Sequence, residues 1–565
     1  MNPFGVTLGA ITEICRITIF IRDIIADGRA YDPDRQGIRD KLEHELLFME
    51  SFRELFFDND GALMRYDRLP TNLRRDVDVT LNALKKTLAE YGMLAARHGF
   101  LDLENDGQAV KTATNDEALI SLRERIKSKL IDLKKKNIDW ALFGKGEMLK
   151  TLSEYSEWAE RLRQTMSLML LTLTAFGDTT LRDFADSKRA MDMGLQEVAQ
   201  RQILAHSGPP EDFKALDGLI VEVSETPNTS SIRLARYEDE WGAAREVVVE
   251  YRTYDSALAY ATEVNSPDLA EMKTPTRNLA WLLCSASFTQ GPDGDVTAIS
   301  NRPGISTLQC LGYLDQPEHY QTIFLYQLPR LRNLGIGSSI ITLHDLINGG
   351  TVGAQAPRPT SKPSLGNRFS LAHTLASAVL NIHSSGWVHK NIWSRGVVVF
   401  PSSTSTPGSE SEQHLVPYLT GWGLARPVLG STDLATNTEA EPNFYRHPSR
   451  QGQPKSSFTA EHDIYALGVV LLEIALWRTI GSVFKKQIDK ATVEGRLPPP
   501  EMVRKALLDR ARADVPREMG EGYAKAVERC LNGDFGVDKD GDERTGLPVA
   551  VREMVVEVIA RGMKL

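Results

Sequence analysis

Two stretches far apart in the sequence constrain the fold of this chain most strongly. The first, GWVHKNIWSRGVVVF at Gly386–Phe400, ends in a β-branched run. The apolar residues before it have helical spacing: Leu371, Leu375, Val379, Leu380 and Ile382. This pattern predicts a helix, a turn and a short buried strand. The second stretch, DIYALGVVLLEIALW at Asp463–Trp477, is predicted to be a buried helix.

Together the two stretches resemble the catalytic loop and the central C-lobe helix of a protein kinase. The family's loop motif is His-Arg-Asp, four further residues and Asn. His389 and Lys390 occupy its first two places, but Asn391 replaces the aspartate and Gly396 replaces the asparagine. The resemblance also implies that Asp463 braces the backbone of this loop.

The two replacements change the chemistry that such a loop can perform. An amide at Asn391 cannot accept a proton from a substrate hydroxyl as a carboxylate can, and Gly396 offers no side-chain oxygen to Mg²⁺. His389 is therefore expected to be a packed structural histidine rather than a base.

The nucleotide-binding parts of the family are also altered. YLTGWGLAR at Tyr418–Arg426 resembles the Asp-Phe-Gly segment, with Gly421 in the place of the metal-binding aspartate. The strand-like run VVVEYR ends in Arg252 where the resemblance places the phosphate-pairing lysine, an exchange that is not neutral. Arg252, Gly421 and Glu271 are the residues that we expect to border a nucleotide cleft.

Glu271 is the expected acidic partner of Arg252, and Glu263 competes for the same role. Thr274 and Pro275 have the pattern of a helix cap and first helical residue, which would place Glu271 just before that helix. Five β-rich segments surround this region: Leu219–Ser224, Ile232–Tyr237, Glu246–Tyr254, Leu308–Leu314 and Thr322–Leu328. The first turn, Glu225–Ser231, contains no glycine, which weakens any phosphate cradle.

The first 205 residues are predicted to be almost wholly helical. They resemble the fungal HeLo domain of HET-S-type (prion-inhibition and propagation) proteins, on the opening PFGVTLGAITEI at Pro3–Ile14 and on the run at Ile138–Leu162. That resemblance implies membrane-directed cell death or non-self recognition. The apolar segment Phe4–Ile25 is either a core helix of the bundle or a helix that can leave it for a membrane.

Composition limits the classes of partner and compartment. The net charge is −9 and the pI is near 5.8, so nothing points to nucleic acid. The basic run Arg123–Lys136 is either a solvated helix face or a contact for anionic lipid. Four widely spaced cysteines without zinc-ligand spacing indicate unbridged thiols in a reducing compartment, and no secretory signal is recognised. The expected location is cytoplasmic, with membrane association on activation.

The sequence thus predicts a multidomain protein, an all-α helical bundle followed by an α+β protein-kinase-like bilobal domain. The expected divisions are a bundle at 1–205, a linker at 206–216, an N-lobe at 217–330 and a C-lobe at 331–565, with insertions at 349–366 and 401–414. The layout is similar to that of mixed-lineage kinase domain-like proteins.

We expect a pseudokinase that regulates the helical effector domain. It would require no cofactor or metal, although it could bind ATP without catalysis. Expected partners are another protein or a second copy, through the helical domain, and an anionic membrane. The alternatives are an atypical Ser/Thr kinase and an interaction scaffold without membrane activity.

Overall fold

The computed structural model describes most of the chain, and the structural statements below concern those residues. They are 3–26, 33–57, 65–97, 145–170, 178–199, 202–203, 209–222, 232–286, 306–329, 340–349, 362–401, 415–428, 440–536 and 543–563, apart from positions 194, 197 and 455. The chain separates into two compact units, Met1–Ala199 and Gln200–Leu565. The basic run Arg123–Lys136, the turn Glu225–Ser231, most of the predicted insertion 349–366 and all but the first residue of the predicted insertion 401–414 lie outside the described residues.

The first unit is helical throughout its described part. Its elements are α1 (Pro3–Ala26), α2 (Pro33–Phe56), the 3₁₀ turn η1 (Tyr66–Arg68), α3 (Thr71–Thr87), α4 (Ala89–Arg97), α7 (Lys145–Leu170), α8 (Asp178–Ala185) and α9 (Lys188–Asp192). The apolar residues Met166–Leu170 form the end of α7.

Helix α1 is enclosed by its neighbours in this unit. It packs against α2, α3 and α4, and its side chains are buried on more than one side, as in Ile14, Ile17, Ile19 and Phe20. This burial explains why its sequence is too broadly apolar for a surface helix. Within the described ranges, no helix combines the length and the apolar composition needed to cross a membrane.

Buried polar contacts tie the helices of the first unit together. The Thr18 hydroxyl of α1 lies 3.2 Å from the Tyr155 hydroxyl of α7. The buried Asp76 carboxylate of α3 accepts hydrogen bonds from Arg161 at 2.8 Å and from Thr165. Such contacts restrict how the helices can slide past one another, since shifting them would leave buried polar groups unpaired.

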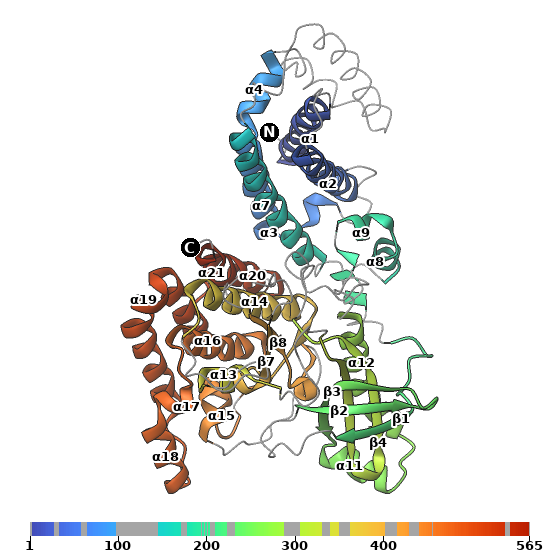
Figure 1. Ribbon diagram of the computed structural model, residues 1–565, viewed down its shortest axis with the longest axis vertical. Coiled ribbons are helices and arrows are strands. Elements are labelled where there is room, and N and C mark those ends of the chain that lie inside the picture. The colour runs from blue at the N-terminus through green and yellow to red at the C-terminus, as the bar shows by residue number, and fades with distance from the viewer. Residues whose placement is uncertain are drawn as a thin grey trace. The chain divides into compact units, whose positions relative to one another are not determined.

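The second unit begins with a five-stranded antiparallel sheet (Figure 1). Its strands are β1 (Gly218–Glu222), β2 (Ile232–Asp239), β3 (Ala244–Thr253), β4 (Cys310–Gln316) and β5 (Gln321–Gln327), in the spatial order β1-β2-β3-β5-β4. Each strand begins and ends within two residues of its predicted segment.

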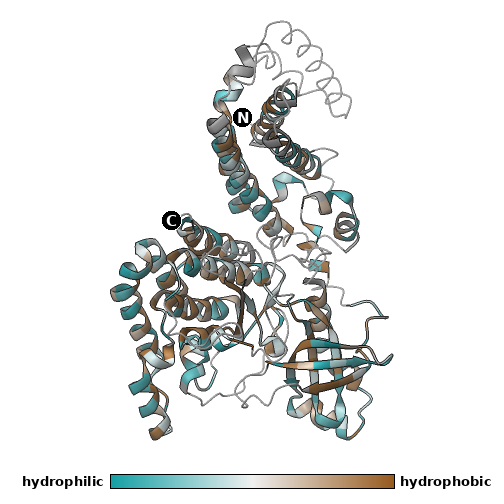
Figure 2. Cartoon of the chain, viewed as in Figure 1, coloured by the Kyte–Doolittle hydropathy of each residue, from teal (hydrophilic) through white to brown (hydrophobic). Residues whose placement is uncertain are grey.

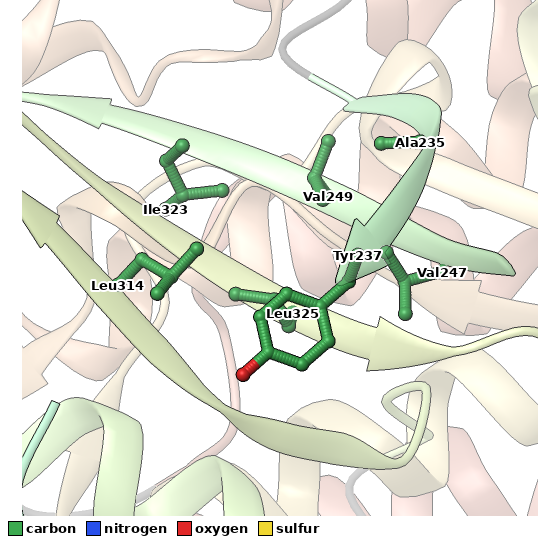
Figure 3. Close-up of a cluster of buried hydrophobic side chains, with 7 residues drawn as sticks. All are labelled: Ala235, Tyr237, Val247, Val249, Leu314, Ile323 and Leu325. Carbon is green, nitrogen blue, oxygen red and sulfur yellow. The ribbon is translucent and has the colours of Figure 1, made fainter. Parts of the chain in front are cut away.

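One face of this sheet forms a small apolar core (Figure 3). It contains Ala235, Tyr237, Val247, Val249, Leu314, Ile323 and Leu325. The alternation of strand side chains places Val248 and Glu250 of β3 on the opposite face. The central strand β3 is therefore buried on both sides, and its two faces differ in chemistry.

Two helices connect β3 to β4, α11 (Ser256–Glu263) and α12 (Leu269–Ala286), and α12 packs against β4. The predicted helix start at Thr274 and Pro275 is wrong, because α12 begins at Leu269 and Pro275 lies inside it. The Thr274 hydroxyl bonds back to the Ala270 carbonyl at 3.2 Å, so it does not cap a helix.

The rest of the second unit is mainly helical. Its helices are α13 (Leu343–Ile347), α14 (Leu365–Ser384), α15 (Ala440–Tyr445), α16 (Ala460–Leu476), α17 (Ile480–Val483), α18 (Lys485–Glu494), α19 (Pro500–Asn532), α20 (Glu543–Val551) and α21 (Glu557–Gly562), with the π-helical turn η9 (Arg552–Val556) between the last two. Short strands form two antiparallel pairs, β6 (Trp387–Val388) with β9 (Arg426–Pro427) and β7 (Val397–Pro401) with β8 (Leu415–Leu419). The prediction of a helical N-terminal part followed by an α+β part is confirmed.

Helix α16 is the centre of this helical part. Most of its residues are buried, and it packs against α14 and along α19. Hydrophobic residues gather between these helices, and hydrophilic residues lie on the outer side of α19 (Figure 2). Gly468 permits the close crossing of α16 and α19, because a Cβ atom there would lie only 2.7 Å from the Cys530 Cβ.

We predict that Gly468→Ala destabilises the chain relative to Gly366→Ala. Both glycines lie in helices, but an added Cβ at Gly366 meets no atom within 4 Å. Overpacking of this kind costs about 1–3 kcal/mol, whereas an open helical site gains from alanine. Urea unfolding of the two full-length variants measures the difference, and equal midpoints would contradict the close crossing.

Candidate functional site

The loop after α14 is held by one buried carboxylate. Asp463, near the start of α16, accepts hydrogen bonds from the backbone N–H of His389 at 2.7 Å and of Lys390 at 2.9 Å. His383 approaches the same carboxylate at 3.2 Å. Lys390 adopts a left-handed backbone conformation with φ of 69°, which is strained for a lysine. The two bonds to Asp463 hold the backbone in that conformation.

His389 is a buried, neutral side chain. Its Nδ1 accepts a hydrogen bond from the Asn391 backbone at 3.3 Å, and its ring packs edge-on against Trp422 with centroids 4.5 Å apart. Burial lowers the pKa of His389 to about 4. The imidazole therefore packs inside the fold and holds the backbone of the loop.

Asn391 and Gly421 are neighbours in space. The Asn391 side-chain amide donates to the Gly421 carbonyl at 3.4 Å, and Gly421 has a positive φ of 83°. A Cβ atom at Gly421 would lie 2.6 Å from Asn391 Nδ2. The loop asparagine thus occupies the space that any side chain at position 421 would need.

Gly396 has a similar steric environment. An added Cβ would lie 2.9 Å from the Trp393 ring at Cδ1. The Gly396 carbonyl accepts bonds from both the backbone N–H and the hydroxyl of Thr420, each at 2.9 Å. Position 396 therefore contributes its backbone to the loop, and Trp393 fills the space beside it.

A second buried carboxylate, Glu250 of β3, holds the segment 421–423. One of its oxygens accepts from the Gly421 N–H and the other from the Gly423 N–H, both at 3.1 Å. The Tyr326 hydroxyl of β5 donates to Glu250 over a longer distance of 3.4 Å. We call this arrangement the Glu250 clamp; it joins the central strand of the sheet to the backbone that follows β8.

Burial and hydrogen bonding act on Glu250 in opposite directions. The side chain is 1% exposed, and desolvation raises its pKa to about 7, although the bonds from Gly421, Gly423 and Tyr326 lower it. The clamp therefore contains a carboxyl group that changes charge near neutral pH.

Arg252 lies two residues after Glu250 on β3, so both side chains are on the same face of the strand. Burial lowers the pKa of Arg252, and its Nη1 is buried without a hydrogen-bond partner among the described residues. The carbons of its side chain approach Gly423, since a Cβ there would lie 3.6 Å from Arg252 Cγ.

The expected pair between Arg252 and Glu271 is not formed. Glu271 is exposed in the first turn of α12, and no hydrogen bond or ion pair joins it to Arg252. The alternative partner Glu263 is exposed at the end of α11. The acidic groups that act on Arg252 are Asp255 and Glu250. Of the expected site residues, His389, Lys390, Asn391, Gly396 and Gly421 come together, and Glu271 does not.

The site does not fit a magnesium–nucleotide complex. Mg²⁺ needs oxygen ligands, but positions 396 and 421 supply no side chain, and the Asn391 amide is directed at the Gly421 carbonyl. Among the described residues, no group of three His, Cys, Asp or Glu side chains could hold a metal ion. What remains is a buried cation, Arg252, beside a backbone segment held by Glu250.

Sequence reasoning missed Glu250. The signal was present, because a single glutamate interrupts the otherwise apolar run Val247–Tyr251 of a central strand. A charged residue in such a place is buried only where donors meet it. Those donors, at Gly421 and Gly423, lie some 170 positions later in the sequence.

The comparison with protein-family models gives a match to part of the chain. A family model described as Domain of unknown function (DUF7580) matches residues 324–563, which is less than half of the chain. The match includes the loop 389–396, the segment 421–423 and Asp463, whereas Glu250 and Arg252 precede it. No curated protein matches the chain.

We predict that ionisation of the buried Glu250 carboxyl lowers the unfolding free energy of the chain as pH rises. Its folded-state pKa of about 7 exceeds the ordinary value of 4.5, so the folded chain keeps a proton that the unfolded chain releases. The stabilising contribution is complete below about pH 4.5 and is lost as pH rises through 7. Relative to Glu250→Gln, the wild type should lose roughly 3 kcal/mol of unfolding free energy across this range.

Urea unfolding at several pH values measures this difference. The glutamine side chain can accept hydrogen bonds at only one of its two polar atoms, so Glu250→Gln lowers the unfolding free energy by an amount that does not depend on pH. Only the change of the difference with pH tests the charge of Glu250. Glu271→Gln, at an exposed side chain, is the matched control and should remain parallel to the wild type. A Glu250→Gln profile parallel to the wild type would contradict the prediction.

Proposed function

We propose that this chain is a regulatory pseudokinase joined to a HeLo-type helical effector, acting in membrane-directed cell death or non-self recognition. The kinase-like unit binds a signal through its altered cleft and does not transfer phosphate. The helical unit is the part that acts, on a membrane or on another protein.

The contact between Asn391 and Gly421 carries the pseudokinase proposal. Phosphoryl transfer needs a catalytic carboxylate and side-chain ligands for metal at these positions. Here the catalytic position is an amide, and that amide fills the space in which a metal-binding side chain at 421 would stand. Asn391 is thus both the residue that stands in place of the base and the one that crowds the metal-ligand position 421.

Two further features support a kinase-like fold. The five-stranded antiparallel sheet precedes the helical part, and a helix connects its third and fourth strands, as the kinase resemblance requires. Asp463 bonds the backbone at His389 and Lys390, which is the bracing role that the same resemblance gives to this aspartate. Neither feature depends on catalysis.

The effector role rests on α1. This helix is apolar enough to be enclosed by its neighbours, yet it carries the Thr18–Tyr155 contact and a second tie, in which the Thr7 hydroxyl donates to Asp78 of α3 at 2.8 Å. An apolar helix that leaves both its polar contacts and its packing inside a bundle can lie in a membrane interface. Its release would be the regulated step.

One observation favours an alternative, an atypical Ser/Thr kinase. The Arg252 Nη1, which has no hydrogen-bond partner in the part of the chain that the structure describes, is a buried cationic donor of the kind that an anionic ligand would satisfy. The phosphates of ATP can accept a hydrogen bond from Arg252 without a metal ion, so nucleotide binding alone does not distinguish a pseudokinase from an atypical kinase. Phosphate transfer does distinguish them.

We predict that ATP raises the melting temperature of the chain without phosphate transfer. Arg252→Ala should abolish the stabilisation, because the buried cation is lost, whereas Arg233→Ala on the neighbouring strand β2 should retain it. Thermal shift and transfer of labelled phosphate to the chain and to a generic protein substrate provide the two measurements. Transfer that Arg252→Ala abolishes would instead establish the atypical kinase.

We also predict that residues 1–205, expressed alone, cause leakage of anionic liposomes and toxicity in cells. Val6 of α1 and Val79 of α3 are both exposed apolar residues, at 58% and 51%. Val6→Glu should suppress leakage because it adds a charge to the inserting helix, and Val79→Glu should not. A fragment without leakage or toxicity would leave an interaction scaffold as the function.

A further inference from the structure

A short segment ahead of the sheet is docked against α12 and β4. It consists of residues 209–216, the last part of the predicted linker, and we call it the strap. The Phe213 ring packs against Trp281 of α12, with ring centroids 4.8 Å apart, and against Tyr313 of β4 at 6.0 Å. The backbone N–H of Leu216 donates to the Tyr313 carbonyl at 2.8 Å. The strap thus contacts both the helix and the strand.

Arg277 holds the strap from the side of α12. Its Nε donates to the Phe213 carbonyl at 2.8 Å, and its Nη2 donates to the Pro210 carbonyl. Arg277 and Trp281 are one helical turn apart, so they lie on the same face of α12. That face therefore offers a charged donor to the strap backbone and an aromatic surface to the Phe213 side chain.

Strand β4 has room for the strap on its side. The register of the strand shifts between Cys310 and Gly312, and Gly312 has a positive φ of 143°. A Cβ atom at Gly312 would lie 2.7 Å from the Leu216 Cδ1 atom. The glycine and the irregularity therefore leave the space that the Leu216 side chain fills, which is a common use of glycine within a strand.

The strap is held by a small number of contacts. Phe213 and Leu216 are half-buried, whereas Glu211, Asp212 and Lys214 are exposed. The strap forms no helix or strand of its own, and its backbone bond to β4 comes from Leu216 at its end. A segment with so little buried surface opens at a lower free energy than the sheet on which it lies.

The chain just before the strap is anchored on the helical part of the second unit. Gln202 is buried, and its side-chain amide donates to the carbonyl of Ser384, the last residue of α14. Residues 202–216 thus connect α14 to α12 and β4. A shift of α12 relative to α14 consequently acts on the strap between its two anchors.

We propose that the strap docks reversibly and that its docking fixes the position of α12. When the strap leaves, α12 loses the two bonds from Arg277 and the contact between Phe213 and Trp281. It retains its packing on α11 and β4 and the bond from Lys273 to Asp315 of β4, at 2.6 Å. Such coupling is reciprocal, so loosening α12 also favours undocking of the strap. This coupling does not depend on the kinase-like interpretation.

Hydrogen exchange of the full-length chain, followed by mass spectrometry of its peptides, tests the docking. Phe213→Ala, in the strap, and Arg277→Gln, in α12, should each speed exchange several-fold in both 209–216 and 269–286. Because the two residues share one contact, the double variant should speed exchange by less than the product of the single effects. Effects that multiply in full would contradict a single docked strap. Lys214→Ala, at an exposed residue of the strap, is the matched control and should behave as the wild type.

A variant outside the strap tests the reciprocal effect. Lys273→Ala removes the bond to Asp315, loosens α12, and should also speed exchange in 209–216 several-fold. Three results would overturn the coupling: unchanged exchange of the strap in Phe213→Ala, a faster strap beside an unchanged α12, or an unchanged strap in Lys273→Ala. Exchange in β3 is the internal reference, and an equal increase there would also overturn the coupling, because the whole sheet would then be loosened.

Discussion

The geometry of the candidate site depends on the buried Asp463 carboxylate. Its bonds to the His389 and Lys390 backbone are charge-assisted, and such bonds contribute about 1.5–3 kcal/mol each. They hold Lys390 in a left-handed conformation that the next residue, Asn391, needs to reach Gly421. From Gly421 the Glu250 clamp continues to the central strand of the sheet. Both carboxylates bind backbone N–H groups, so they fix the path of the chain whatever side chains the loop carries.

The second unit buries carboxyl groups where separate elements meet, and their desolvation costs free energy. Glu473 of α16 is fully buried and accepts hydrogen bonds from the Tyr445 hydroxyl and the Ile480 backbone N–H, at 2.7 Å each. Its Oε2 has no hydrogen-bond partner among the described residues. Burial raises the pKa of both Glu473 and Glu250 to about 7. In each case desolvation outweighs the hydrogen bonds, so each carboxyl group binds or releases its proton near neutral pH. The stability of this unit is consequently tied to the acidity of its surroundings.

The sequence predicted elements better than it predicted contacts. The alternating and β-branched runs located all five strands, because these patterns are local and the sheet buries them as expected. The Thr274–Pro275 cap pattern failed because the helix had already begun at Leu269, and a proline in its early turns loses only one hydrogen bond. Glu250 escaped notice because its partners are backbone groups of a distant segment, which no side-chain pattern marks.

The crowding around Asn391 and Trp393 limits how this chain could change by mutation. An acidic side chain placed at 421 would collide with Asn391, and one placed at 396 would collide with Trp393. Installing a metal ligand at 421 therefore requires Asn391 to move and the new residue to keep a positive φ of 83°, and installing one at 396 requires the Trp393 ring to shift. A single acidic substitution at either position would thus have to displace a packed neighbour before its carboxylate could face a metal ion.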